Sequence, residues 1–129
     1  MHWCFESAEA IDARQLKRDL MTILRERGDE EGDFSAAELI CGELVGNAKR
    51  HARGRITIEL MWQSPHPVFS VHDENDSFLA QAELPADPWA QSGRGLYIVK
   101  RLARDFQVVD IVENGSKVVA TLPVRKKVS

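Results

Sequence analysis

The residues best suited to chemistry lie in one segment, E-L-V-G-N-A-K-R-H, at positions 43–51. Glu43, Asn47 and Arg50 stand at i, i+4 and i+7, so on a helix they share a face, and His51 lies one turn beyond Asn47. A carboxylate oxygen and an amide oxygen on one face suit Mg²⁺ and its waters. The segment therefore predicts a magnesium site, and the alternative from spacing alone is that Asn47 simply faces water.

Two glycines are part of the same helical pattern: Gly46 lies within the segment and Gly42 immediately precedes it. In a helix interior each glycine costs about 1 kcal/mol relative to alanine, so some gain should offset them. Either they allow close packing against another element, or a glycine beside the oxygen atoms lets a ligand approach closely. The spacing favours neither explanation.

A second candidate is Asp73, in the segment V-H-D-E-N-D-S that follows an apolar run. A carboxylate at a strand end can accept a hydrogen bond from an exocyclic amine such as that of adenine. Aspartate at a strand end is also a common turn former, which is the alternative for Asp73.

A third candidate is S-G-R-G-L-Y-I-V, in which Gly93 and Gly95 flank Arg94 and Leu96 opens an apolar run. Backbone N–H groups at the start of a helix are free to meet an anion there. The alternative is a helix N-terminus without a ligand. The segment is not a Walker A loop, because no G-K-[ST] follows, and no preceding parallel strand makes it a Rossmann fingerprint.

Two amphipathic helices are expected before and around the first of these segments. The pattern predicts one helix at 13–28, with Ser7 able to cap it, and a second at 35–51, with Ser35 and Glu38 forming a capping box. The apolar positions recur at three and four in both. They are Leu16, Leu20, Ile23 and Leu24 in the first helix, and Ala37, Ile40, Cys41, Leu44, Val45 and Ala48 in the second.

Alternating apolar residues predict strands at 3–5, 56–62, 68–71, 106–112 and 118–122, with a turn at 113–116. The strands 56–62 and 68–71 should form an antiparallel hairpin. Residues 74–94 have no sustained period and predict a long functional loop, and a third helix begins at Gly95. This order predicts an α+β fold, a two-layer sandwich whose mixed, mostly antiparallel sheet carries helices on one face.

Composition limits the function classes. The 129 residues, 43% apolar and 29% charged, suffice for one domain over 1–129. A net charge of −3 argues against direct nucleic-acid binding, although residues 93–129 carry eight Lys/Arg against three Asp/Glu. Cys4 and Cys41 lie in no Cys/His cluster, so neither suggests a metal site. With no leader and no apolar window long enough to cross a bilayer, the sequence predicts a cytoplasmic protein without a membrane partner.

Together the three segments resemble the GHKL ATPases, the gyrase and histidine-kinase superfamily. E-L-V-G-N-A-K-R-H is similar to its N box, Asp73 stands where its adenine-binding aspartate stands, and G-R-G-L-Y-I-V is similar to its glycine box. Their order and separations also agree, and the similarity spans nearly the whole chain. The short length and the F-E-S-A opening most resemble the bacterial anti-sigma factor serine/threonine kinases of partner-switching systems. The resemblance implies the Bergerat (histidine-kinase-type) version of the predicted sandwich.

The resemblance also implies roles for individual residues. Asn47 would coordinate the Mg²⁺ that bridges the phosphates of ATP, and Glu43 would be the general base toward a substrate serine hydroxyl. Asp73 would bind the adenine amino group. These roles agree with phosphoryl transfer, in which a metal and oriented donors provide most of the catalysis.

The phosphate side of the implied site comes from the glycine box. Gly93 and Gly95 would let backbone amides approach the phosphates, Leu96 would join the nucleotide site, and residues 76–92 would form a lid. Charge and placement alone add three further candidate phosphate contacts, which are Arg50, His51 and Arg94.

The implied partners are proteins. The resemblance suggests an anti-anti-sigma (STAS-like) protein as the phosphorylated substrate, a sigma factor as the sequestered partner, and a homodimer. The exposed side of the first helix, with Arg14, Lys17, Arg18 and Arg25, is either a docking surface or an ordinary solvated face. A helix-turn-helix DNA binder fits poorly, because no recognition helix has an outward basic face.

Two segments depart from the family pattern. Where the family has D-x-G-x-G, this chain has Asp73-Glu74-Asn75-Asp76-Ser77, and where it has G-T-T, the chain has Gly115-Ser116-Lys117. Asn75 tolerates a turn, but a charged side chain replaces backbone near the base, and the hydroxyl is either shifted to Ser116 or lost. The departures leave an alternative function, a catalytically weak or inactive binding module of the same fold that regulates a partner by contact.

Overall fold

A five-stranded sheet forms one layer of the molecule. The computed structural model describes residues 2–7, 12–51, 55–73, 94–111 and 115–128. The strands are β1 (His2–Ser7), β2 (Ile56–Met61), β3 (Val68–Asp73), β4 (Asp105–Ile111) and β5 (Gly115–Thr121), in the spatial order β1-β2-β3-β5-β4. All four neighbouring pairs are antiparallel, and β2 and β3 form the predicted hairpin.

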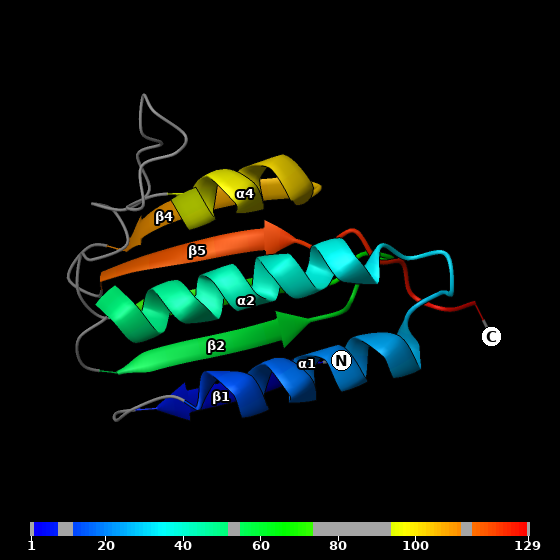
Figure 1. Ribbon diagram of the computed structural model, residues 1–129, viewed down its shortest axis with the longest axis horizontal. Helices are drawn as coiled ribbons and strands as arrows, with labels where there is room; N and C mark the ends of the chain where they lie inside the picture. The colour runs from blue at the N-terminus through cyan, green and yellow to red at the C-terminus, as the bar shows by residue number, and fades with distance from the viewer. Residues whose placement is uncertain (1, 8–11, 52–54, 74–93, 112–114, 129) are drawn as a thin grey trace.

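Three helices within the described residues form the second layer. α1 (Ala13–Arg27), α2 (Phe34–His51) and α4 (Arg94–Leu102) lie side by side over one face of the sheet, with α2 in the middle (Figure 1). The predicted α+β sandwich with helices on one face is therefore confirmed. Among the described residues, no helix combines the length and apolar character that crossing a membrane requires.

Both predicted helix caps are wrong by a few residues. Ser7 belongs to β1, and α1 is capped by Asp12, whose carboxylate accepts a hydrogen bond from the Gln15 N–H at 3.1 Å. α2 begins before Ser35, and Asp33 accepts from the Ala36 N–H at 3.0 Å. The first N–H groups of a helix have no acceptor within the helix. In both helices an aspartate three residues before such an N–H group supplies the acceptor oxygen.

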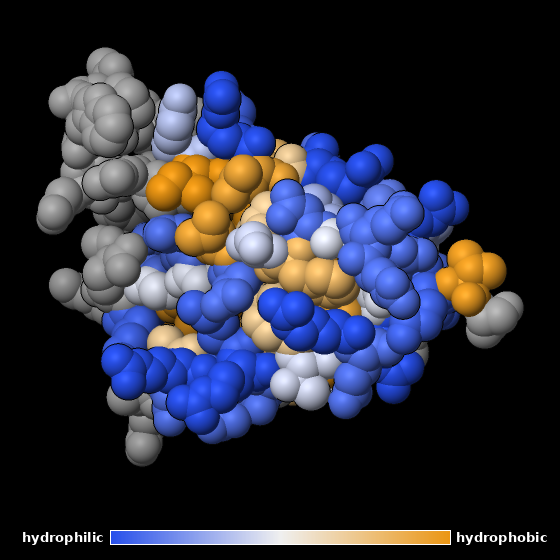
Figure 2. Space-filling model, turned by 45° about the vertical axis from the view of Figure 1, so that its right-hand side comes forward, coloured by the Kyte–Doolittle hydropathy of each residue, from blue (hydrophilic) through white to orange (hydrophobic). Residues whose placement is uncertain are grey.

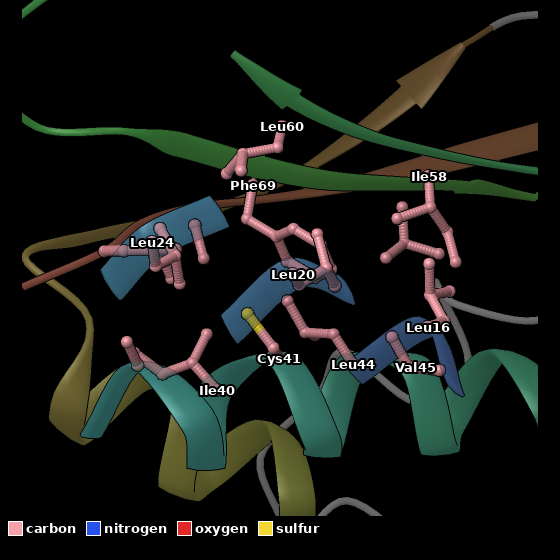
Figure 3. Packing of buried hydrophobic residues seen from close by; sticks show 14 of the residues in the cluster. Leu16, Leu20, Leu24, Ile40, Cys41, Leu44, Val45, Ile58, Leu60 and Phe69 are labelled. Carbon is pink, nitrogen blue, oxygen red and sulfur yellow. The ribbon is translucent and has the colours of Figure 1, made fainter. Parts of the chain in front are cut away.

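The core lies between α1, α2 and the sheet, as the apolar patterns predict. Figure 3 shows side chains of both helices converging on those of β2 and β3. All six positions of the predicted α2 stripe are buried, and in α1 the pattern holds for Leu16, Leu20 and Leu24, with Ile23 partly buried. Met21 is a further buried residue that the pattern does not contain.

Strand register determines which positions face the helices. Successive residues of a strand point to opposite faces, so aligned partners form rows. The partners Leu60, Phe69 and Ala120 are all buried and form a row against the helices. Ile56 lies four residues before Leu60 on β2, an even number, so it faces the same side of the sheet as Leu60. Its Cα partner on β3 is Asp73.

The C-terminal residues close one end of the sandwich. Lys126 pairs with Gly28 just after α1, and the Trp62 indole N–H donates to the Pro65 carbonyl at 3.1 Å. A Cβ at Gly28 would lie 2.6 Å from both the Leu24 carbonyl oxygen and Val124 Cγ1, so only glycine fits there. The end with the start of α4 lies opposite this closed end (Figure 1).

The buried thiol of Cys41 makes a pH-dependent contribution to stability. Burial raises the pKa of Cys41 from 9.0 to about 12. The folded protein therefore holds this proton more tightly than the unfolded chain, and stability that is complete below pH 9 is lost as the pH rises toward 12. Urea unfolding at increasing alkaline pH should show a loss of about 1.4 kcal/mol per pH unit from this group.

The variant Cys41→Ala should lack this part of the pH dependence, whereas Cys4→Ala, which changes an exposed thiol, should retain it. Equal slopes for the wild type and Cys41→Ala would contradict the assignment.

Candidate functional site

The three segments with candidate functional residues meet at one end of the sandwich. α2 ends there at His51, β3 ends there at Asp73, and α4 begins there at Arg94 (Figure 1). β2 starts at the same end, because Ile56 pairs with Asp73. Segments that are 20 residues or more apart in sequence thus contribute to one region, which we call the α2–α4 end.

α2 presents Asn47 on the side away from α1, whereas Glu43 also lines a hollow next to Lys17 of α1. Asn47 is only 5% exposed, and Glu43, one turn earlier, is partly exposed. At roughly 100° per residue, Asn47 lies about 140° around the helix from Gly42, which faces α1. The predicted shared face of Glu43 and Asn47 therefore exists, and the alternative in which Asn47 faces water is wrong.

The donor atoms here fit a magnesium ion carried by a nucleotide. Among the described residues, no group of three His, Cys, Asp or Glu side chains is placed to hold a metal ion. Mg²⁺ commonly keeps several waters and takes one or two protein oxygens beside phosphate oxygens. The amide oxygen of Asn47, with the Glu43 carboxylate nearby, suits that mode and not an all-protein cage.

Asp73 and Ser116 occupy aligned positions on neighbouring strands. They are Cα partners in the β3–β5 pairing, in the row that also contains the buried Ile56. The strand end predicted for Asp73 is confirmed. The register also places the backbone of Ser116 directly opposite that of Asp73.

The start of α4 has the backbone arrangement expected of an anion site. Arg94, Gly95 and Leu96 are its first three residues, and the first turn contains no acidic residue. The unpaired N–H groups and the helix dipole make such an end favourable for phosphate. Arg50 and His51 lie in the last turn of α2, whereas Gly93 and the predicted lid, 76–92, are outside the described residues.

Gly42 does not serve helix packing. Among the described residues, the atom nearest to a Cβ built on it would be Lys17 Cδ at 3.6 Å, an ordinary contact, so alanine would fit between α1 and α2. This finding removes close packing as the explanation for Gly42.

Instead, Gly42 lies on the floor of a groove between α1 and α2 that the sequence did not predict. We define the α1–α2 groove by two adjoining hollows that share Lys17 and Gly42. The first, of about 490 Å³, is lined by Ala13, Arg14, Lys17, Arg18, Gly42 and Val45. The second, of about 510 Å³, is lined by Lys17, Ser35, Glu38, Leu39, Gly42 and Glu43. The sequence held two clues to it, the cost of a glycine inside a helix and the basic exposed side of the first helix.

Comparison with protein-family profiles matches residues 6–122 to a single family, described as the histidine kinase-like ATPase domain. The matched range includes α1, α2 and α4, the end of β1 and all of the other four strands, and it contains every candidate residue at the α2–α4 end. Comparison with curated proteins gives no match.

Proposed function

Because the chain belongs to the histidine kinase-like ATPase family, we propose that it binds ATP with Mg²⁺ at the α2–α4 end and transfers the γ-phosphoryl group to a protein serine or threonine. The acceptor is a small antagonist of the anti-anti-sigma (STAS-like) kind, and the second partner is a sigma factor that the protein sequesters. The proposal at this finer level rests on the resemblance of the N box and the glycine box to the anti-sigma factor kinases.

The observation that supports the proposal most is the arrangement of Glu43 and Asn47. Both project from one side of α2, Asn47 is almost buried, and the α2 terminus lies at the same end as Asp73 and the start of α4. This end thus combines a carboxylate, a metal-binding amide and an anion-binding helix N-terminus. Those are the groups that phosphoryl transfer requires.

Each residue has one task in the proposed reaction. Asp73 accepts a hydrogen bond from the adenine amino group, and the first N–H groups of α4 hold phosphate oxygens. Asn47 holds Mg²⁺, which when bound neutralises phosphate charge. Glu43 accepts the proton of the acceptor hydroxyl while the hydroxyl oxygen bonds to the γ-phosphorus. The bond from the γ-phosphorus to the departing ADP oxygen breaks.

A phosphorylation assay tests this proposal. The purified protein is incubated with Mg·ATP labelled at the γ-phosphate and with a candidate STAS-like antagonist. The expected product is a phosphoserine or phosphothreonine on the antagonist and ADP in equal amount. The absence of phosphoprotein from every antagonist that binds the chain would contradict the kinase function.

The departures from D-x-G-x-G favour a second candidate function. In it the protein holds a sigma factor or another regulator by its surface alone, and the nucleotide site is degraded. Partner binding would then be the same with and without Mg·ATP, and Asn47→Ala would not change it. A partner affinity that depends on both the nucleotide and Asn47 would exclude this alternative.

A further inference from the structure

The α1–α2 groove is separate from the phosphate-binding start of α4, because α2 lies between α1 and α4 (Figure 1). Its walls come from two helices whose apolar stripes are buried against the sheet. On this helix-bearing face Figure 2 shows strongly hydrophilic side chains over the lower, α1 side. The groove is thus a hollow lined by charged and apolar residues that lies apart from the start of α4, and one of its lining residues, Glu43, also belongs to the proposed catalytic site.

Gly42 leaves the floor of the α1–α2 groove open, although glycine destabilises the α2 helix. Alanine is the better helix former and meets no clash within the described part of the chain, where the nearest atom to its Cβ would be Lys17 Cδ at 3.6 Å. Neither the helix nor the contact between α1 and α2 therefore requires glycine. A ligand that touches the backbone of α2 does require it, because any side chain would occupy the space shared by both hollows.

The two hollows of the groove carry opposite charges. The hollow toward the start of α1 carries Arg14 and Arg18, whereas the other carries Glu38 and Glu43. Lys17 lies between them, with its ammonium 3.3 Å from a Glu38 carboxylate oxygen, and both side chains are more than 40% exposed. Leu39 adds an apolar side chain that is 50% exposed at the acidic side.

The opposite charges of the two hollows indicate which class of ligand fits the groove. A nucleic acid carries negative charge along its whole length and would meet Glu38 and Glu43 in the second hollow. A protein segment with acidic residues at one end and an apolar then basic residue at the other would complement the whole groove. We propose that the α1–α2 groove binds such a segment of a protein partner, with its acidic end at Arg14 and Arg18 and its backbone against Gly42.

The proposal does not depend on the kinase activity, so its test uses binding alone. A displayed library of random peptides is selected on the immobilised full chain, and then on the Gly42→Leu variant. The wild type should enrich peptides with acidic residues at one end and an apolar and a basic residue at the other. The Gly42→Leu protein should not retain them.

Matched variants then measure the affinity of one enriched peptide by fluorescence anisotropy. The double variant Arg14→Ala, Arg18→Ala should bind about five- to tenfold more weakly. Arg101→Ala, which removes an exposed arginine from α4, should bind as the wild type does. Glu38→Gln removes a carboxylate from the acidic hollow that receives the basic end of the peptide, and it should weaken binding by about threefold.

The smaller change Gly42→Ala separates folding from binding. It should weaken peptide binding while raising the melting temperature by about 4 °C, since alanine favours the helix and meets no clash. A loss of peptide affinity in a Gly42→Ala protein of higher melting temperature thus cannot be an effect of misfolding.

Three results would overturn the proposal. One is that the Gly42→Leu variant retains every peptide that the wild type selects. Another is that the wild type enriches peptides without acidic residues. The third is a single-stranded oligonucleotide that displaces the enriched peptide and binds as tightly as it does.

Discussion

Replacing Glu43 by glutamine should lower the rate of phosphoryl transfer by about 10²- to 10⁴-fold at saturating acceptor, because the substitution removes the general base but retains the side chain's shape. The affinity for Mg·ATP should remain within about threefold of the wild-type value, since the carboxylate is assigned to the acceptor hydroxyl and not to the nucleotide. Single-turnover phosphorylation and a nucleotide titration on the same preparation measure the two effects separately.

Glu26→Gln is the matched control for this prediction. It removes a carboxylate from an exposed position of α1, far from the α2–α4 end, and should change neither quantity. An unchanged transfer rate for Glu43→Gln would remove Glu43 from the chemistry. An equal loss of rate and nucleotide affinity would make it a nucleotide-binding residue instead.

Replacing Leu20 by alanine should lower the free energy of unfolding by about 2–5 kcal/mol. Leu20 is fully buried between α1, α2 and the sheet, and the cavity left by its side chain would be surrounded by other buried apolar groups (Figure 3). For a domain of this size the loss is a large share of total stability. Urea unfolding at neutral pH measures it.

Leu39→Ala makes the same chemical change on a neighbouring helix. Because Leu39 is 50% exposed, this variant should change the free energy of unfolding by no more than about 0.5 kcal/mol. Similar losses at the two positions would show that α2 does not bury the face described.

The helices and strands of this fold could be predicted because their apolar residues recur with clear periods. The α2 stripe from Ala37 to Ala48 is buried as expected, since every member lies within one side of a helix. The caps could not be chosen in the same way. Asp33 and Ser35 are both good capping residues and stand two positions apart, so only the hydrogen bond from Ala36 identifies the right one.

The sheet order could be predicted only in part. The hairpin of β2 and β3 is local, and the turn residues between the strands indicate it. The pairing of β3 with β5 joins positions more than 40 residues apart in sequence, and no local pattern specifies it. The alignment of Asp73 with Ser116 depends on that pairing, so the sequence could name Ser116 but could not place it.

The spacing of Glu43 and Asn47 predicted a shared helical face, and the face exists because helix periodicity alone determines it. The α1–α2 groove depends instead on how two helices pack and on how Lys17 lies across Gly42. Neither property follows from the residues of one helix. The cost of Gly42 indicated that something was unusual there, but not what.

A calorimetric titration with Mg·ATP tests the central claim, that the α2–α4 end is an adenine nucleotide site. The wild type should bind one Mg·ATP per chain and bind Mg·GTP more weakly, because guanine has a carbonyl oxygen in place of the 6-amino group of adenine and cannot donate that hydrogen bond to Asp73. Asp73→Asn should bind Mg·ATP about 10- to 100-fold more weakly, the effect of a lost charged hydrogen bond. Absence of binding heat for the wild type, or equal affinities for the wild type and Asp73→Asn, would contradict the claim.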